Sequence, residues 1–298
     1  MHRTIAVTTD LSQASREAFG IAVAVARRLE AHILFLHAEP DEDIVTPWQV
    51  PPSTSEKSRQ CRKSHRRLRE FLRDLPELAG VSFESCTLPG GTADSICEAV
   101  DRFHVQRLVM ATHGHAGIQR FLYGSFTARL LQQYTVPVLV VRSAPLTLDS
   151  TLRAFAPEVI LLPSDLSEVN RQACEAAHTW ACAFGSRVRV VHVVDPELSH
   201  FELAASVGTD PPEGLEDLCA AAHRKLEELI HNELAGLPAE ASVRTGEPTI
   251  EVALEAERAR ADLVILSSRA LAARDRGELR SVAEGIIQTA PCPVLIVN

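Results

Sequence analysis

The stretch VPVLVV at residues 136–141 decides the fold, because it returns 156 residues later as CPVLIV at residues 292–297. At the same spacing, LVMA at residues 108–111 matches VILS at residues 264–267. Self-similarity at a fixed period is the sequence signature of a repeated structural unit. The chain is therefore predicted to contain two copies of one domain.

The front of each copy repeats as well. IAVTTDLS at residues 5–12 corresponds to ILLPSDLS at residues 160–167, now at a spacing of 155, so the copies differ in length by one residue between these matches. A chain of 298 residues with 46% hydrophobic residues is long enough for two domains of ordinary size. We predict domains at residues 1–143 and 157–298, joined by a linker at residues 144–156.

Apolar runs alternate with stretches of helical spacing in both copies. Several of the apolar runs are continuous Val, Ile and Leu segments, which are typical of strands buried on both faces of a parallel sheet. Ser12 and Ser167 stand where they would cap the helix that follows the first strand of each copy. After those first strands at residues 5–9 and 160–164, the predicted strands are 33–37, 83–88, 108–112 and 138–141, and 188–193, 242–245, 263–267 and 294–297. The predicted fold is α/β, with two tandem doubly wound domains, each an open five-stranded parallel sheet with helices on both faces.

Ligands of such sheets bind beyond the carboxyl ends of the strands. After the fourth strand of the first copy come Ala111-Thr112-His113-Gly114, nine further residues, and then Gly124-Ser125 at the start of a predicted helix. Glycine lets the backbone approach an anion closely, and the N–H groups that open a helix face negative charge. This pattern favours a phosphate-binding loop in the first copy.

These motifs resemble those of the universal stress proteins, specifically the tandem type with two domains in one chain. The resemblance spans nearly the whole chain and rests on DLS at residues 10–12, THG at 112–114, GS at 124–125 and the closing VPVLVV strand. It implies that the first domain binds ATP, with or without Mg²⁺. It also implies that the two domains associate through their last strands as an intramolecular pseudo-dimer, and it leaves a homodimer open.

The family's nucleotide-binding residues carry over to this sequence one by one. The resemblance implies that Asp10 lies near the adenine or ribose and that the backbone of Ala38 contacts the adenine. It places the remaining members of the set around the phosphates and at the start of the following helix: Ala111, Gly114, Gly124, Ser125 and Phe126.

Both copies depart from the family pattern. Ala111 stands where the family has its first glycine; if that position needs a positive φ, the alanine costs on the order of 1 to 2 kcal/mol. In the second copy Ser267, Ala270 and Arg280 occupy the three glycine positions, while Asp165 and Ser281 are retained. The second domain is therefore predicted to have lost its nucleotide site.

Charge is distributed unevenly along the chain. The net charge is −9, but residues 1–149 carry 17 Lys and Arg against 16 Asp and Glu, while residues 150–298 carry 13 against 23. Residues 57–69 hold seven Lys or Arg, predicted to form a basic helical face. Aromatic residues do not interleave these charges, which disfavours nucleic acid as a partner. Attraction between the basic helix and the acidic second copy is an alternative to simple solvation.

The cysteines and histidines give no metal-ligand pattern. The seven cysteines have no CxxC spacing and are interpreted as buried thiols of a cytoplasmic protein, and Cys174 and Cys182 as small core residues of one helix. His37 and His192 end the second strands, where a hydrogen bond to a neighbouring loop is expected. The N-terminus has neither the length nor the flanks of a signal peptide or membrane span.

The leading hypothesis is a cytoplasmic ATP-binding stress-response or regulatory module, with no catalytic or metal-binding residues assigned and with unidentified protein partners. A nucleotide-free scaffold is one alternative. The other is a slow ATP hydrolase that uses Asp10 with Mg²⁺.

Overall fold

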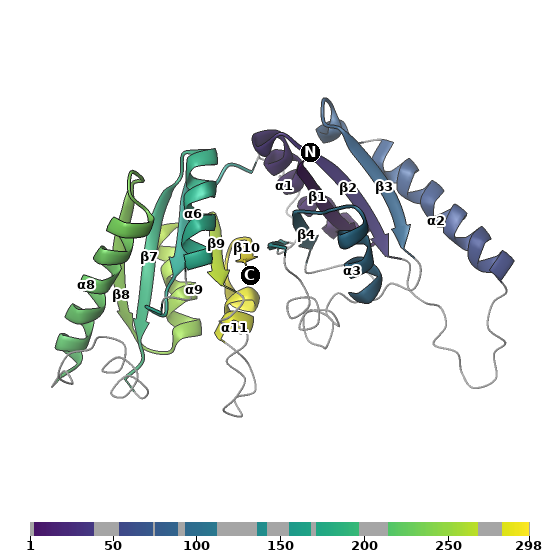
Figure 1. The fold of residues 1–298 in the computed structure, drawn as a ribbon. Coiled ribbons are helices and arrows are strands. Elements are labelled where there is room, and N and C mark those ends of the chain that lie inside the picture. Colours follow the sequence, from purple (N-terminus) through teal and green to yellow (C-terminus); the bar gives the residue numbers. More distant parts are fainter. Residues whose placement is uncertain are drawn as a thin grey trace, which may run out of the picture. The chain divides into compact units, whose positions relative to one another are not determined.

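The computed structural model describes residues 3–38, 54–73, 75–88, 93–111, 136–141, 155–167, 171–196, 214–267 and 282–297. The chain divides into two units, Met1–Phe155 (unit 1) and Ala156–Asn298 (unit 2). Each unit is a parallel sheet with helices on both faces, which confirms the predicted fold class (Figure 1). Among the described residues, no helix combines the length and the apolarity needed to cross a membrane.

Unit 1 has the strand order β3-β2-β1-β4-β5, with every pair parallel. The last five residues of β1, the last four of β4 and all four of β5 are buried, as expected for the interior of a doubly wound sheet. The elements are β1 (Arg3–Thr9), α1 (Gln13–Leu29), β2 (Ala31–Ala38), α2 (Thr54–Arg73), a 3₁₀ turn η1 (Pro76–Leu78), β3 (Phe83–Leu88), α3 (Ala93–Arg102), β4 (Arg107–Ala111) and β5 (Val138–Val141).

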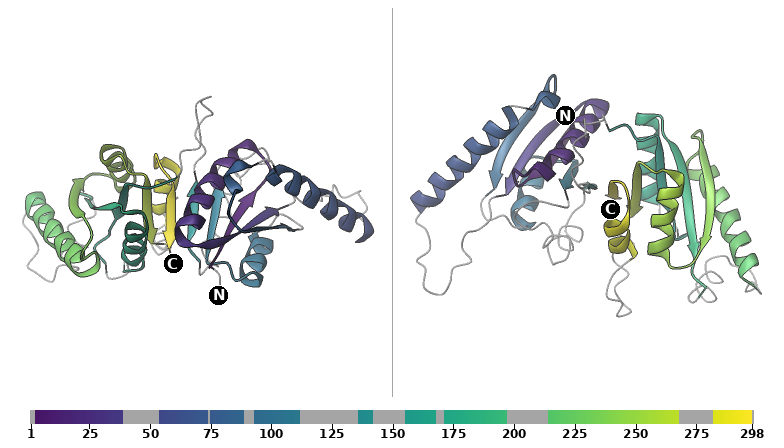
Figure 2. Two further views of the ribbon diagram at one scale, coloured as in Figure 1. Left: turned by 90° about the horizontal axis from the view of Figure 1, so that it is seen from above. Right: turned by 180° about the vertical axis from the view of Figure 1, so that it is seen from behind.

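An aromatic cluster holds α1 and α2 against one face of the unit 1 sheet. Phe19 of α1 contacts Phe35 of β2 and Phe71 of α2, with ring centroids 4.9 and 6.0 Å apart. Phe83 of β3 meets Phe35 edge-on at 5.8 Å. The helix α3 packs on β2 and β3 from the opposite face, as the two views of Figure 2 show.

Unit 2 repeats this plan with the order β8-β7-β6-β9-β10, again parallel throughout. α6 and α8 contact one another, as do α9 and α11, so two helix pairs sandwich the sheet. The elements are β6 (Val159–Pro163), α6 (Arg171–Phe184), β7 (Arg187–Val194), α8 (Leu215–Glu233), β8 (Ala239–Thr245), α9 (Pro248–Ala259), β9 (Leu263–Ser267), α11 (Val282–Thr289) and β10 (Val294–Val297).

Strand register confirms both repeat spacings. Ile5 pairs with Arg107 across β1 and β4, and the residues 155 and 156 positions later, Ile160 and Leu263, pair in the same way. Ile33 of β2 lies opposite Phe83 of β3, just as Val188 lies opposite Ala239. The one-residue length difference therefore falls between β2 and β3 of the repeat.

One sequence prediction about local structure needs correction, and the predicted cap at Ser167 stays a prediction. β8 begins at Ala239 rather than at Ser242, because pairing with β7 recruits an alanine-rich segment of low strand propensity. Ser12 caps α1 as predicted, accepting the N–H of Ser15. The hydroxyl of Ser167, in contrast, donates to Asp165 Oδ1 at 2.6 Å, and residues 168–170 before α6 lie outside the described residues.

Unit 2 contains a buried ionic network that has no counterpart among the described residues of unit 1. Glu255 of α9 has a fully buried side chain that accepts hydrogen bonds from Arg189 of β7 and from Arg244 of β8, the latter at 2.6 Å. The Ser242 hydroxyl donates to the same carboxylate at 3.1 Å. Arg189 also pairs with Glu240 at 2.6 Å. Every oxygen of the buried carboxylate thus has a partner.

Candidate functional site

The turn after β1 fixes the candidate ligand residue Asp10. The Leu11 N–H donates to Thr9 Oγ1 and the Ser12 N–H donates to Asp10 Oδ1, both at 2.9 Å. Leu11 adopts φ 62°, a left-handed conformation that costs a branched-chain residue energy and is held by the surrounding hydrogen bonds. The Thr9 hydroxyl also bonds to that of buried Ser15 at 2.8 Å. One oxygen of Asp10 is therefore committed to shaping the turn.

Unit 2 builds the same turn from the corresponding residues. The Leu166 N–H donates to Ser164 Oγ at 3.1 Å, the Ser167 N–H donates to Asp165 Oδ1 at 3.0 Å, and Leu166 again has φ 62°. Neither the two left-handed leucines nor the positioning role of Thr9 was predicted from the sequence. The signal was present, since a hydroxyl residue precedes Asp-Leu-Ser in both copies.

Strand register brings Asp10, Ala38 and Ala111 together at one edge of the unit 1 sheet. Thr9 pairs with His37, so Asp10 and Ala38 are the next residues of neighbouring strands. Val7 pairs with Val109, which puts Ala111 level with Thr9 on the other side of β1. The strand order reverses between β1 and β4, where doubly wound sheets bind ligands. The assignment of these residues to a nucleotide stays a prediction.

The two aspartates differ in what their carboxylates do. Asp10 is half-buried, and its second oxygen, Oδ2, is buried with no hydrogen-bond partner among the described residues. Asp165 is exposed, and its Oδ1 accepts both the N–H and the hydroxyl of Ser167. A buried carboxylate oxygen without a partner is costly unless a donor meets it. Within the described part of the chain, Asp10 alone of the pair offers such an unused acceptor.

Ala111 does not carry the backbone penalty that replacement of a glycine suggested. It is the last residue of β4, pairs with Val141, is almost fully buried, and does not have a positive φ. The expected cost of 1 to 2 kcal/mol therefore does not arise, because alanine adopts a strand conformation without strain. In unit 2 Ser267 takes this place, with a buried hydroxyl that has no partner among the described residues.

The phosphate-loop residues lie outside the described residues. These are Gly114, Gly124, Ser125 and Phe126 in unit 1, and Ala270, Arg280 and Ser281 in unit 2. Their roles therefore remain predictions.

The histidines at the strand ends are structural, as predicted. His37 Nδ1 lies 2.8 Å from the carbonyl oxygen of Thr9, and His192 Nδ1 lies 2.8 Å from that of Ser164. A carbonyl only accepts, so Nδ1 carries the hydrogen in both rings. Burial lowers the pKa of His192, an effect that its hydrogen bond with Ser164 and the charge of Asp165 only partly offset. The imidazole of His192 is therefore neutral, and its hydrogen bond links the end of β7 to the turn after β6.

The cysteines are free thiols, but they are not uniformly buried. Cys174 and Cys292 are buried, and burial raises the pKa of each to about 12. Cys182 is exposed, which corrects the expectation that it shares the buried face of α6 with Cys174. Among the described residues, no group of three or more His, Cys, Asp or Glu side chains is arranged to hold a metal ion.

Both halves of the chain match the model of one protein family. The universal stress protein family model matches residues 1–142 and again residues 157–298. This chain belongs to the universal stress protein family. The tandem arrangement predicted from the internal repeat is confirmed by the double match.

Relatives of this universal stress protein match it by halves or in full. Universal stress protein MJ0531 of Methanocaldococcus jannaschii is 30% identical over 146 residues, which is 47% of this chain and 81% of the relative. A Thermus aquaticus universal stress protein is 31% identical over 147 residues, 47% of this chain and 98% of the relative. The crystal structure of a universal stress protein from Archaeoglobus fulgidus covers 99% of this chain and 96% of its own, with a TM-score of 0.65 and 18% identity, and so shares the fold.

Proposed function

We propose that unit 1 binds an adenine nucleotide, ATP, at the carboxyl ends of β1, β2 and β4, and that unit 2 does not. The protein then serves as a nucleotide-responsive regulatory module of the stress response rather than as a strong catalyst. The observation that carries the proposal is the unused, buried Oδ2 of Asp10 at the switch point of the sheet. Its counterpart in unit 2, Asp165, is exposed and engaged with Ser167.

The residues at this edge fit an adenosine group. A carboxylate oxygen held in place by a turn accepts hydrogen bonds from ribose hydroxyls or from the adenine amino group. Ala38 follows His37 at the same level as Asp10, where its backbone lies beside the nucleoside. The glycines at 114 and 124 would leave peptide N–H groups open to the triphosphate, with or without Mg²⁺.

The test compares two matched variants by isothermal titration with ATP and Mg²⁺. Asp10→Ala and Asp165→Ala each remove the same turn hydrogen bond, so a loss of folding stability caused by the turn appears in both proteins. We expect Asp10→Ala to weaken ATP binding by about tenfold to a hundredfold, the worth of a charge-assisted hydrogen bond. Asp165→Ala should bind like the wild type. Equal effects of the two substitutions would overturn the assignment of Asp10.

A second measurement separates the nucleotide-binding module from a nucleotide-free scaffold. Freshly purified protein is denatured and its small molecules are identified by mass spectrometry, and thermal unfolding is followed at millimolar ATP. Recovered ATP or ADP, or an upward shift of the melting temperature, supports the proposal. If the wild type gives neither result, the nucleotide-free scaffold is the remaining hypothesis. Rapid phosphate release that disappears in Asp10→Asn would instead indicate the hydrolase.

A further inference from the structure

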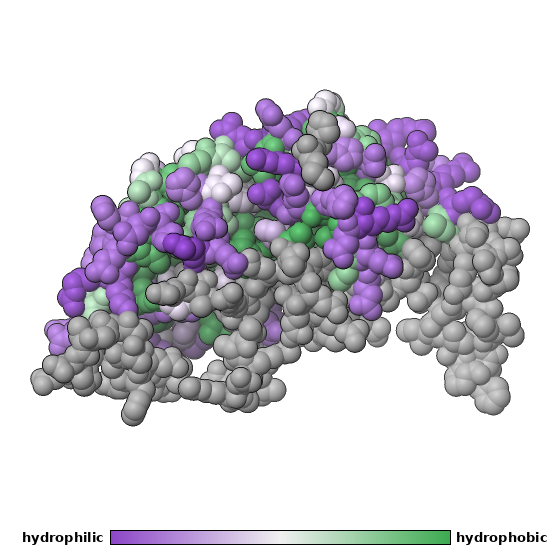
Figure 3. Space-filling model, viewed as in Figure 1, coloured by the Kyte–Doolittle hydropathy of each residue, from purple (hydrophilic) through white to green (hydrophobic). Residues whose placement is uncertain are grey.

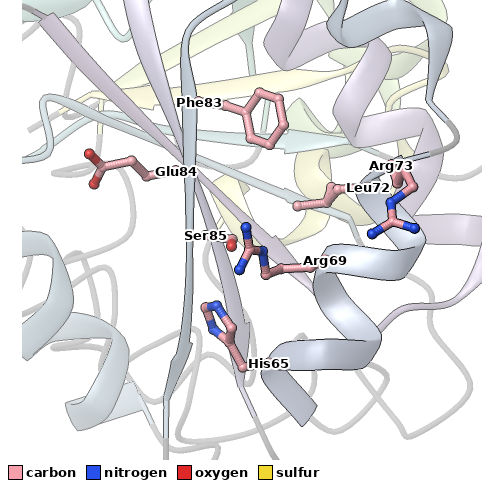
Figure 4. Close-up of a pocket in the computed structure, with 7 residues that line it drawn as sticks. All are labelled: His65, Arg69, Leu72, Arg73, Phe83, Glu84 and Ser85. Atoms are coloured by element: carbon pink, nitrogen blue, oxygen red, sulfur yellow. The ribbon is translucent and has the colours of Figure 1, made fainter. Parts of the chain in front are cut away.

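A groove runs between α2 and β3 of unit 1, away from the candidate nucleotide site. Its volume is about 500 Å³. Two arginines, a histidine, a leucine, a phenylalanine and a serine face it: Arg69, Arg73, His65, Leu72, Phe83 and Ser85 (Figure 4). Glu84 also borders the groove, but its side chain points to the other side of β3, as alternation along a strand requires. The side chains that project into the groove are therefore basic and apolar.

Cations form a stripe along α2 beside this groove. Arg62, Arg66, Arg69 and Arg73 are all exposed, and their spacing of four, three and four residues places them along one side of the helix. Arg66 is paired with Glu70 at 2.9 Å. Neither Arg69 nor Arg73 has an ion-pair partner within the ranges that the structure describes. Among the described residues, Glu70 is thus the one carboxylate paired with the stripe.

The fold does not require this charge. Unit 2 places α8 beside β8 in the same arrangement, and the exposed face of α8 carries carboxylates, among them Glu216, Asp217, Glu227 and Glu228. Hydrophilic residues cover the visible surface over both α2 and α8 (Figure 3), but the sign of their charge differs. Register puts Ala239 and Ala241 of β8 at the positions of Phe83 and Ser85. The basic, aromatic lining is specific to unit 1.

β3 offers backbone groups as well as side chains. It is the outer strand of its sheet and pairs with β2 on one side only. The N–H and C=O groups of an edge strand are a template for a further strand. Phe83, 41% exposed, provides an apolar contact at the same edge, above the buried Leu72. A ligand that uses the whole groove must supply both a backbone and negative charge.

We propose that the α2–β3 groove binds an extended acidic segment of a partner protein, which adds to β3 as the next strand of the unit 1 sheet. Side chains on one face of an extended strand repeat every ~6.8 Å. Arginines four residues apart on α2 are spaced by ~6 Å along the helix. Alternate carboxylates of the segment therefore meet successive arginines, and an apolar side chain among them fits against Phe83.

Nucleic acid fits the groove less well. A phosphate backbone has no peptide groups to pair with the edge of β3, and the net charge of −9 on the chain opposes binding of a polyanion over a larger area. Phe83 and His65 are the two residues lining the groove that offer a ring for base stacking, fewer than a strand of successive bases would use.

Fluorescence anisotropy with labelled 12-residue peptides tests the proposal on the full chain. One peptide alternates Glu with Val, a second has the same composition with its glutamates in one block, and a third is the alternating peptide with N-methyl groups on every second amide. We expect the alternating peptide to bind the wild type best and the N-methylated peptide to bind at least tenfold more weakly, because it cannot complete the strand ladder.

Matched charge reversals locate the binding surface. Arg69→Glu/Arg73→Glu should weaken binding of the alternating peptide at least tenfold. Arg187→Glu/Arg224→Glu makes the same charge change at exposed positions of unit 2 and should leave binding unchanged. Equal losses in the two double variants, no binding by the wild type at millimolar peptide, or equal binding of the block peptide or of inorganic polyphosphate would overturn the proposal. Self-association of the wild type that disappears in Arg69→Glu/Arg73→Glu would also overturn the proposal, because the groove would then bind a second copy of this chain.

Discussion

Units 1 and 2 share a backbone plan but differ in the chemistry of three corresponding positions. By strand register, Leu34 corresponds to Arg189 and Leu88 to Arg244. Ala99 of α3 corresponds to Glu255 of α9, because each lies five residues before a left-handed residue, His104 or Arg260. In unit 1 these three positions are apolar and at most 7% exposed. In unit 2 they are the ionic network beneath α9.

The comparison shows that this sheet and its helices accept either an apolar or an ionic contact at the same place. A buried ion pair gives little net stability compared with apolar residues that fill the same space, because both charges lose their hydration. Removing one partner is different, because the remaining charge has nothing to replace the lost water. The two units should therefore respond very differently to the same kind of substitution.

The largest expected effect follows from removing the shared carboxylate. Glu255→Ala leaves Arg244 and the Nε of Arg189 without their main partner and should lower the unfolding free energy of unit 2 by about 3 kcal/mol. The value is at the low end of the usual range, because Arg189 keeps Glu240 and is 24% exposed. In a Trp48→Phe background, Trp180 of α6 reports urea unfolding of unit 2. An unchanged midpoint would show that the network is not a coupled unit.

Copying the apolar contact of unit 1 into unit 2 should reverse that loss. The triple variant Arg189→Leu, Arg244→Leu and Glu255→Ala removes all three charges of the two ion pairs at once. We expect its stability to equal that of the wild type or to exceed it by about 1 to 2 kcal/mol, in the same urea assay. A triple variant as unstable as Glu255→Ala alone would mean that packing in unit 2 has become specific for the charged residues.

Acid should destabilise unit 2 through the same network. Burial alone raises the pKa of Glu255, but hydrogen bonds from Arg244, Arg189 and Ser242 and the charge of Arg189 outweigh it, so the pKa lies below the ordinary 4.5. A carboxyl group with a lowered folded-state pKa contributes stability that is complete above about pH 4.5 and is lost as the pH falls further.

The neutral ring of His192 also makes unit 2 less stable as the pH falls. Its folded-state pKa lies below 6.5, so its contribution is lost as the pH falls from about 6.5. Acid unfolding followed by Trp180 fluorescence should begin at a higher pH in the wild type than in the triple variant, because only the wild type depends on an ionised Glu255. Identical acid transitions in the two proteins would contradict this account of the network.

The helix caps give a smaller effect that again separates the units. Ser12 accepts the Ser15 N–H at the start of α1, so Ser12→Ala should destabilise the first turn of α1 by about 1 kcal/mol. Within the described residues the Ser167 hydroxyl makes an exposed hydrogen bond to Asp165 alone, so Ser167→Ala should cost less. Amide hydrogen exchange of peptides from α1 and α6 measures the two changes separately. A larger increase of exchange in α6 on Ser167→Ala than in α1 on Ser12→Ala would contradict this prediction.

The sequence predicted the strands well because continuous Val, Ile and Leu runs leave little choice of structure. The start of β8 escaped prediction, since Ala-Glu-Ala has no strand preference of its own and pairs only because β7 is there. The Glu255 network also escaped, because its members lie on β7, β8 and α9, as far as 66 residues apart in the chain. Such contacts depend on tertiary packing that local patterns do not encode.

The candidate site was predictable to a similar degree. Asp10, Ala38 and Ala111 were expected at one sheet edge, and parallel strands that end together do place them there. The left-handed Leu11 was not predictable from propensity, because leucine avoids that conformation. The different surroundings of Asp10 and Asp165 were equally hidden, since the two motifs are the same three residues.

The central claim, that one unit of this universal stress protein holds a nucleotide and the other does not, is tested most directly by the stoichiometry of ATP binding. Isothermal titration of the wild type should give one ATP per chain. Gly124→Arg, which puts into unit 1 the residue that unit 2 has at Arg280, should weaken that binding more than tenfold. A stoichiometry of two ATP molecules per chain would contradict the account. So would an affinity of Gly124→Arg for ATP equal to that of the wild type.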